Sequence, residues 1–150
     1  MNRTEKTLSL LLRLGGAVML AALGAVVMPF DWMNRIHQFL GMGALPDFPI
    51  VGYLTRSLSA FYALHGALLL FVAGDVRRYL PVIRFLALAA GVFGAVMLVL
   101  DRLVGMPLGW TVVEGPYVAA ISALLFWLAG RTGKVVSAAE VRSPASEGSE

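Results

Sequence analysis

Apolar and polar positions alternate along this chain in long blocks. Four apolar runs cover about residues 8–27, 51–72, 81–100 and 110–129, and short polar segments separate them. As a helix rising about 1.5 Å per residue, the run 51–72 reaches roughly 33 Å, enough to cross the hydrocarbon core of a bilayer. The pattern predicts an all-α fold, a transmembrane four-helix bundle over residues 1–130. Residues 131–150 are rich in Ser, Ala, Glu and Gly and are predicted to form a disordered cytoplasmic tail.

The segment between the first two runs has a different period. Apolar residues at helical spacing share one face, namely Trp32, Met33, Ile36, Phe39 and Leu40, and polar residues occupy the other. Asp31 is placed to cap such a helix at its start. We therefore expect a short interfacial amphipathic helix, with Trp32 at the depth of the lipid headgroups.

Turn-forming residues mark the span ends. Gly74 is predicted as a left-handed C-cap of the second span, and Pro81 follows in the first turn of the third. The short connection predicts that these two spans pair as an antiparallel hairpin. In the fourth run, the Glu114-Gly115-Pro116 sequence predicts a kinked or broken first turn, or an ordinary boundary between loop and helix.

Composition narrows the class of protein. The chain is 59% hydrophobic and 14% charged, whereas soluble domains average about 25% charged residues. It has no cysteine, which excludes disulfides, thiolate metal sites and cysteine nucleophiles. No nucleophilic triad, phosphate-binding loop, dinucleotide fingerprint or zinc helix is present. We expect neither enzymatic activity nor a cofactor. The net charge is +3, but the basic residues flank the spans and do not form one patch, so we also expect no nucleic-acid partner.

Basic residues are distributed unevenly between the two sides of the predicted bundle. One side holds Arg3, Lys6, Arg13, Arg77, Arg78, Arg84, Arg131, Lys134 and Arg142, and the other holds Arg35, Arg56 and Arg102. The bias predicts that both termini are cytoplasmic. The first run resembles a signal peptide, but its length, Arg13 and the leucine at position 23 favour a retained helix over a cleaved one.

Each span carries small residues four positions apart, which would let helix backbones approach closely. These rows are Ala17, Ala21 and Ala25; Ser59, Ala63 and Ala67; Ala87, Gly91 and Ala95; and Ala119 and Ala123.

Polar residues at the outer ends of the spans are the candidate site. Arg56, Asp101 and Glu114 fall at one end of the bundle, with Arg35 and Asp31 nearby. They are expected to form either an ion-pair network that fixes helix ends or a ligand-binding site. His65 lies near mid-membrane, where it is either a packed neutral histidine or a proton relay or haem ligand.

Two stretches, YLTRSLSAFYALHGALLLFVAGDVRRY and DRLVGMPLGWTVVEGP, resemble a group of small uncharacterised bacterial integral membrane proteins. The likeness covers roughly residues 31–117 and implies a multi-pass protein of the bacterial cytoplasmic (inner) membrane. The four-span layout is also similar to DoxX-like membrane proteins, some of which are linked to respiratory or redox complexes.

Three functions follow as hypotheses. The first is a non-enzymatic binding or accessory subunit whose outer polar cluster meets a membrane protein partner, a second copy or lipid headgroups. The second is a small proton-coupled carrier that uses Glu114 and His65. The third is a subunit of a redox complex that contacts quinone or haem near His65. The first is preferred because only His65 lies deep among the spans.

Overall fold

The computed structural model describes residues 2–142, with side chains up to Gly133, and this part of the chain holds six helices and no strand. The helices are α1 (Arg3–Leu20), α2 (Leu23–Val26), α3 (Phe30–Phe39), α4 (Pro49–Gly74), α5 (Leu80–Val104) and α6 (Leu108–Arg142). Four segments are long and apolar enough to cross a membrane: Arg3–Val26, Pro49–Gly74, Leu80–Val104 and Leu108–Gly133. The expected all-α, four-span architecture of a multi-pass membrane protein is confirmed.

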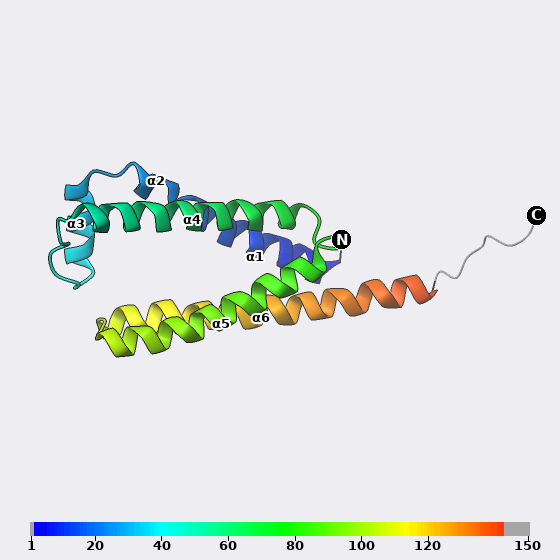
Figure 1. Cartoon of the computed structure of the whole chain (residues 1–150). Helices are drawn as coiled ribbons and strands as arrows, with labels where there is room; N and C mark the ends of the chain where they lie inside the picture. Colours follow the sequence, from blue (N-terminus) through cyan, green and yellow to red (C-terminus); the bar gives the residue numbers. More distant parts are fainter. Residues whose placement is uncertain (1, 143–150) are drawn as a thin grey trace, which may run out of the picture.

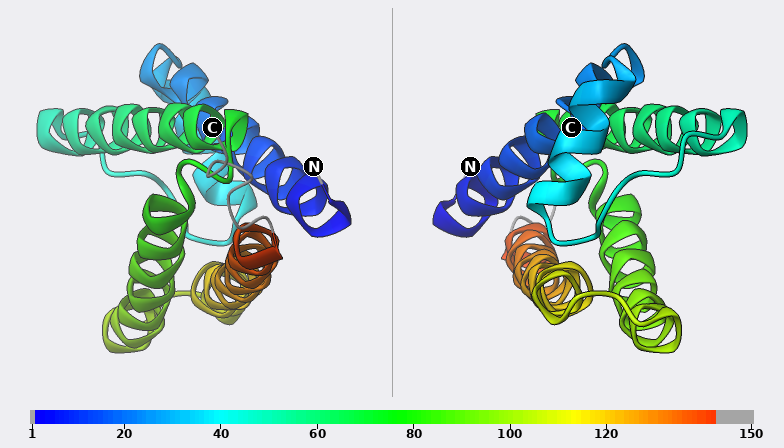
Figure 2. Two further views of the ribbon diagram at one scale, coloured as in Figure 1. Left: turned by 90° about the vertical axis from the view of Figure 1, so that its right-hand side faces the viewer. Right: turned by 90° about the vertical axis from the view of Figure 1, so that its left-hand side faces the viewer.

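The long helices form two antiparallel pairs, α1 with α4 and α5 with α6 (Figure 1). Figure 2 shows the two pairs diverging from each other when the molecule is viewed along its length. The expected hairpin of the second and third spans is therefore wrong: α4 and α5 follow one another across the short turn 75–79, but each packs mainly on another helix. We call the end with residues 2–5 and this turn the N-terminal end, and the opposite one the α3 end.

Glycines set the closest approach within the first pair. A Cβ atom added to Gly66 would meet backbone atoms of Gly16, Met19 and Leu20 at 2.6–3.0 Å, and one added to Gly16 would meet the Gly66 carbonyl oxygen at 2.9 Å. Only glycine fits such a reciprocal crossing, and the short distance favours dispersion contacts and Cα–H···O contacts between the helices.

The second pair repeats this arrangement at Gly94 and Gly115, where an added Cβ on either residue would lie 2.9 Å from the other's carbonyl oxygen. The expected rows of small residues are used only in part. Ala63 and Ala87 are buried, whereas Ala17, Ala21, Ala67, Ala95 and Ala123 are exposed. The backbones cross where the Cβ atom is missing, since an alanine at these positions would still hold them apart.

The buried core lies toward the N-terminal end. It joins Leu8 and Leu12 of α1, Leu69, Val72 and Ala73 of α4, Val76 of the turn, Ile83 of α5, and Leu128 and Ala129 of α6. Because all four spans contribute, this cluster is where the two helix pairs meet. Toward the α3 end the pairs are less buried.

The amphipathic helix between the first two spans is confirmed as α3. It buries Met33 and leaves Trp32, Ile36 and Phe39 exposed, as expected for a helix in contact with the membrane interface. Its start differs from the prediction: Pro29 occupies the cap position, and Asp31 lies in the first turn without capping the helix.

Helix α6 departs most from the sequence-based expectation. It runs unbroken from Leu108 through Pro116, so the expected break is wrong. The Gly115 contact with Gly94 lies directly before the proline and holds the helix on its partner there, and membrane helices tolerate proline where neighbours compensate. The backbone stays helical to Arg142 instead of becoming disordered from residue 131, because extending an existing helix costs little. Residues 143–150 of the expected tail lie outside the described residues.

The glycine C-cap is also found elsewhere than expected. Gly74 is the last residue of α4 and has no positive φ, so the prediction for it is wrong. Gly105, with φ 72°, ends α5 in the left-handed conformation, which glycine adopts without steric cost.

Replacing Gly66 by Ala should separate α1 from α4, because the new methyl group meets backbone atoms that cannot move aside. We expect the free energy of unfolding in detergent to fall by about 1–3 kcal/mol, as for overpacked cores. The matched control is Gly15→Ala, which meets nothing within 4 Å and should leave stability unchanged or raise it through helix propensity. Equal stability of the two variants in a denaturant titration would contradict the crossing.

Candidate functional site

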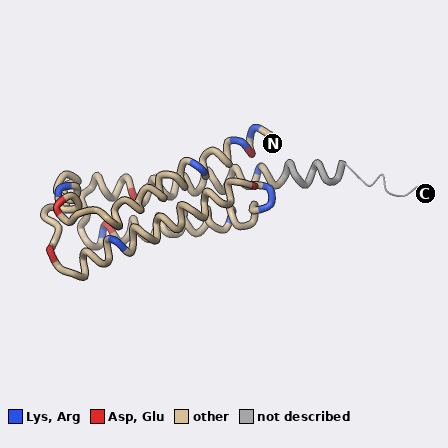
Figure 3. Tube along the Cα trace, turned by 90° about the horizontal axis from the view of Figure 1, so that it is seen from above, with Lys and Arg blue, Asp and Glu red and all other residues tan. Residues whose placement is uncertain are grey.

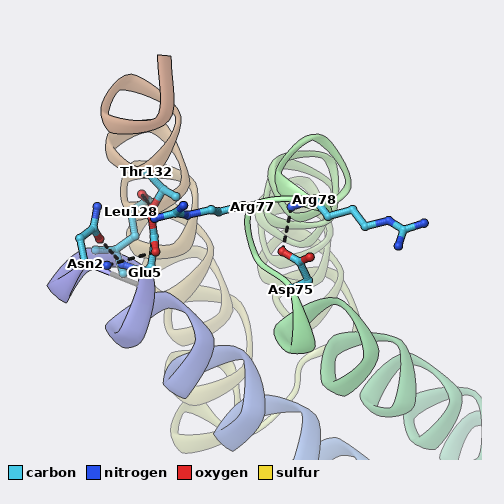
Figure 4. Close-up of polar contacts among 7 residues, drawn as sticks. All are labelled: Asn2, Glu5, Asp75, Arg77, Arg78, Leu128 and Thr132. Carbon is cyan, nitrogen blue, oxygen red and sulfur yellow. Dashed lines mark hydrogen bonds and ion pairs between the residues drawn. The ribbon is translucent and has the colours of Figure 1, made fainter. Parts of the chain in front are cut away.

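An ion pair closes the N-terminal end of the molecule (Figure 4). The Arg77 Nε donates to Glu5 Oε1 at 2.8 Å, and the two residues lie 72 positions apart in the sequence. The Glu5 side chain is fully buried, whereas that of Arg77 is 55% exposed. This contact raises the pKa of the Arg77 guanidinium, which keeps the cation charged beside the buried carboxylate.

The cap of α1 places the Glu5 carboxylate. Asn2 and Glu5 form a capping box, in which the Asn2 side chain accepts from the Glu5 backbone N–H at 2.8 Å and Glu5 Oε2 accepts from the Asn2 backbone N–H at 3.1 Å. Such reciprocal bonds satisfy backbone donors at a helix start and fix the side chains that make them.

Three segments surround this ion pair. Figure 4 shows Leu128 and Thr132 of α6 beside Glu5, while Arg77 reaches it from the turn between α4 and α5. Thr132 is buried and donates to the Leu128 carbonyl oxygen at 3.0 Å. One turn further along α1, Ser9 donates to the Ala73 carbonyl oxygen at 2.8 Å. The ion pair therefore sits where both helix pairs converge.

Sequence reasoning missed this contact. It treated Arg77 as a charge that sets topology and gave Glu5 no role. The spacing of Asn2 and Glu5 is a capping-box signature, so a helix start at residue 3 was readable. That Arg77 pairs with Glu5 could not be predicted from the sequence, because the pairing depends on how α1 packs against α4.

Among the described side chains, Arg56 forms no ion pair and bonds to backbone carbonyls instead. Its Nε donates to the Val26 carbonyl oxygen and its Nη2 to that of Met28, both at 3.1 Å, and its Nη1 donates to the Gly52 carbonyl oxygen at 3.3 Å. The Val26 and Met28 carbonyls are available because the helix ends at Val26, whereas Gly52 lies within α4, one turn before Arg56. The guanidinium thus caps the end of the first span, and the expected contacts with Asp101 and Glu114 are not formed.

Asp101 lies in the second helix pair. Its side chain is 3% exposed, and its Oδ2 atom has no hydrogen-bond partner among the residues that the structure describes. It shares one face of α5 with the buried residues Ile83, Ala87 and Gly94, and that face packs on α6 through Gly94. A buried carboxylate oxygen without a donor is costly to maintain.

Glu114 lies on α6, one residue before the Gly115 crossing. Its Oε2 accepts from the Trp110 indole Nε1 at 2.6 Å, a short bond typical of a carboxylate acceptor. Both residues are half-buried. Within residues 2–133, no lysine or arginine lies within ion-pair distance of either Asp101 or Glu114.

Asp31 and Arg35 are exposed on α3, and among the described side chains neither forms an ion pair with the other residues of the expected cluster. His65 lies on α4 beside Gly66 and is half-buried. The other histidine, His37, lies on α3, where its Nδ1 is 2.9 Å from the Gly43 carbonyl oxygen. The five residues of the expected outer cluster thus share one end of the molecule without forming one network.

Helix α3 and the loop 40–48 form a folded cap at this end. Asn34 Oδ1 accepts from the Leu45 backbone N–H at 2.9 Å and from the Gln38 side chain at 3.0 Å. Because a carbonyl oxygen only accepts, His37 must donate its Nδ1 proton to Gly43. Gly41 and Gly43, with φ near +78°, permit the turns that return the loop to α3. We refer to residues 30–48 as the α3 cap.

Within the described residues, no group of three His, Cys, Asp or Glu side chains lies close enough to hold a metal ion. Comparison of the chain with protein-family models, curated proteins and solved structures finds no match.

Replacing Arg77 by Gln should destabilise the protein more than replacing Glu5 by Gln, because the first change removes the Arg77 cation from beside a buried carboxylate. Glutamine at position 5 also preserves the capping box. The double variant should unfold at a higher temperature than Arg77→Gln alone. The measurement is the midpoint of thermal unfolding in detergent, followed by circular dichroism.

Arg78→Gln serves as the control, because the Arg78 side chain is exposed and stacks over Tyr79. If Arg77→Gln and Arg78→Gln unfold at the same temperature, the ion pair does not contribute to the stability of the fold.

Proposed function

We propose that this protein is a non-enzymatic binding or accessory subunit in the bacterial inner membrane, with both termini in the cytoplasm and the α3 cap on the outer side. The bias of basic residues supports this orientation. Figure 3 shows lysine and arginine positions near the N-terminus and near the turn between α4 and α5, which would face the cytoplasm.

The observation that carries the proposed subunit role is the folded α3 cap. Anchoring in a membrane interface needs only an apolar helix face. Here the loop 40–48 is additionally fixed to α3 by the bonds of Asn34 and His37, and the exposed side chains of Asp31, Arg35 and Asp47 carry charges of both signs. A rigid surface with mixed charges suits recognition of a protein partner, since fewer groups lose conformational freedom on binding.

Arg56 contributes to this role indirectly. By bonding to the carbonyl oxygens at the end of α2, it fixes the chain that enters α3. We assign it a positioning role beneath the cap, in place of the direct ligand contact expected from the sequence. The four-span layout shared with DoxX-like proteins, some of them linked to redox complexes, supports a place in a larger membrane assembly.

The proposed orientation is tested by cysteine labelling, because the chain has no cysteine of its own. Asp47→Cys should react with a membrane-impermeant maleimide in spheroplasts, and Arg78→Cys should react only after lysis. Both positions are exposed, so accessibility differs only by side of the membrane. Labelling of Arg78→Cys before lysis would reverse the orientation.

The subunit role is tested by photocross-linking in native membranes, with p-benzoylphenylalanine in place of Arg35. We expect one adduct of defined mass, which mass spectrometry identifies as a partner protein or a second copy. The same probe in place of Val92, an exposed apolar position within α5, should give no protein adduct.

A charge-reversed cap, Asp31→Lys with Arg35→Glu, should abolish an adduct formed from a probe at the neighbouring residue Gln38, while leaving the protein folded. Finding only uncross-linked protein at positions 35 and 38 would refute docking through the cap.

A further inference from the structure

Asp101 is a buried acidic residue to which the α3 cap gives no role. Its side chain is 3% exposed, and its Oδ2 atom has no hydrogen-bond partner among the described residues. Within residues 2–133, no lysine or arginine forms an ion pair with it. An ionised carboxylate in such surroundings is unfavourable unless a positive charge lies beside it. A buried polar atom of this kind therefore points to a further binding partner, such as an ion.

The antiparallel register of the second helix pair places Asp101 opposite Thr111. A Cβ atom added to Gly115 of α6 would lie 2.9 Å from the Gly94 carbonyl oxygen and 2.9 Å from the Leu98 Cβ atom of α5. From this contact, the step from Leu98 to Asp101 and the step from Gly115 to Thr111 each advance by about one turn toward the α3 end. Thr111 is also 3% exposed. Two polar side chains thus lie buried across from each other between α5 and α6.

The short turn that joins the two helices fixes these positions. Figure 1 shows α5 and α6 side by side up to this turn. The Asp101 carbonyl oxygen accepts from the backbone N–H groups of Gly105 and Met106, the latter at 2.9 Å. The next residue, Pro107, accepts from the Thr111 backbone N–H at 3.1 Å. Successive residues of one tight turn therefore bond to the backbones of Asp101 and Thr111.

The hydrogen-bond donors at the start of α6 are directed to other acceptors. The backbone N–H groups of Trp110 and Thr111 both donate to the Pro107 carbonyl oxygen, at 2.9 and 3.1 Å. The Trp110 indole donates to Glu114. The Thr111 hydroxyl donates to the Pro107 carbonyl oxygen at 3.4 Å, so its own oxygen presents lone pairs to other neighbours. Asp101 and Thr111 thus offer each other oxygen acceptors and no donor.

Oxygen acceptors around one negative charge suit a small metal cation. Hard cations prefer oxygen ligands and complete their coordination with water. A divalent ion is disfavoured, because within the described residues no three His, Cys, Asp or Glu side chains converge. A monovalent ion balances the single charge of the Asp101 carboxylate. A water molecule on its own would donate to Oδ2 but would leave that charge uncompensated in buried surroundings.

We propose that Asp101 and Thr111 bind a small monovalent metal cation beside the turn between α5 and α6. The Asp101 carboxylate neutralises the ion, the Thr111 hydroxyl oxygen is a second ligand, and water completes the coordination. The ion joins the two helices on the α3 side of the Gly94 and Gly115 crossing, where each presents an oxygen atom to the other. This site is independent of docking through the α3 cap.

The test follows thermal unfolding of the full-length protein in detergent while sodium chloride replaces choline chloride at constant total salt. An ion that binds only the folded state raises the unfolding midpoint as its concentration rises, and we expect this for the parent. Asp101→Asn should abolish the response to sodium. In choline chloride it should unfold at no lower temperature than the parent, because the new amide is uncharged and can donate to Thr111. Asp47→Asn removes the same charge from an exposed loop position and should keep the full response.

A second variant on the other helix guards against misfolding of the first. Thr111→Val removes the hydroxyl oxygen and keeps the branched shape of the side chain. It should raise the sodium concentration that gives half of the midpoint shift by roughly tenfold, a typical effect of altering the surroundings of a metal ion. A parent midpoint that is the same in sodium and in choline chloride would overturn the proposal. So would a sodium response that both Asp101→Asn and Thr111→Val retain unchanged.

Discussion

The fold depends on direct backbone contact between helices at two glycine pairs. In a bilayer, lipid tails compete with apolar side chains, so helices gain little from burying leucine against leucine. Contact between backbones adds attraction that lipid does not match. Gly16 with Gly66 and Gly94 with Gly115 provide it in each helix pair. The antiparallel register of the first pair then brings Ser9 to Ala73, Glu5 to Arg77 and Val26 to Arg56.

The two ends of the molecule treat charge in opposite ways. At the N-terminal end, the buried Glu5 carboxylate accepts from Arg77 and from the Asn2 backbone N–H, next to the apolar core to which all four spans contribute. At the α3 end, the cation Arg56 is bonded to carbonyls, while Asp101 and Glu114 have no cation among the described side chains. Among the described side chains, the carboxylate at the N-terminal end is thus paired with a cation, and those at the α3 end are not.

Hydropathy predicted the number of spans and the amphipathic α3, because both depend on the average polarity of a segment. Pairing was not predictable in the same way. Alanine and glycine look equivalent in a row of small residues, yet only the absence of a Cβ atom permits the crossing at Gly66. The sequence also predicted a helix break at Pro116 that does not occur. The close contact of Gly115 with α5 holds α6 in place next to the proline, and the helix continues.

The candidate site was predicted in part. Arg56, Asp101 and Glu114 do share one end of the molecule. The first lies near the start of α4, the second near the end of α5 and the third near the start of α6, and successive spans run in opposite directions. Their partners were not predictable, because the carbonyls that bind Arg56 become free only where α2 happens to stop.

The pairing of α1 with α4 also has a consequence for how the chain is made. Helices α5 and α6 are neighbours in sequence and can associate as soon as both have left the ribosome. Glu5 must wait for Arg77, 72 residues later, which takes roughly 4–14 s at about 5–20 residues per second. During biogenesis α1 therefore resides in the membrane without its partner, its Gly16 surface covered by lipid or by the insertion machinery.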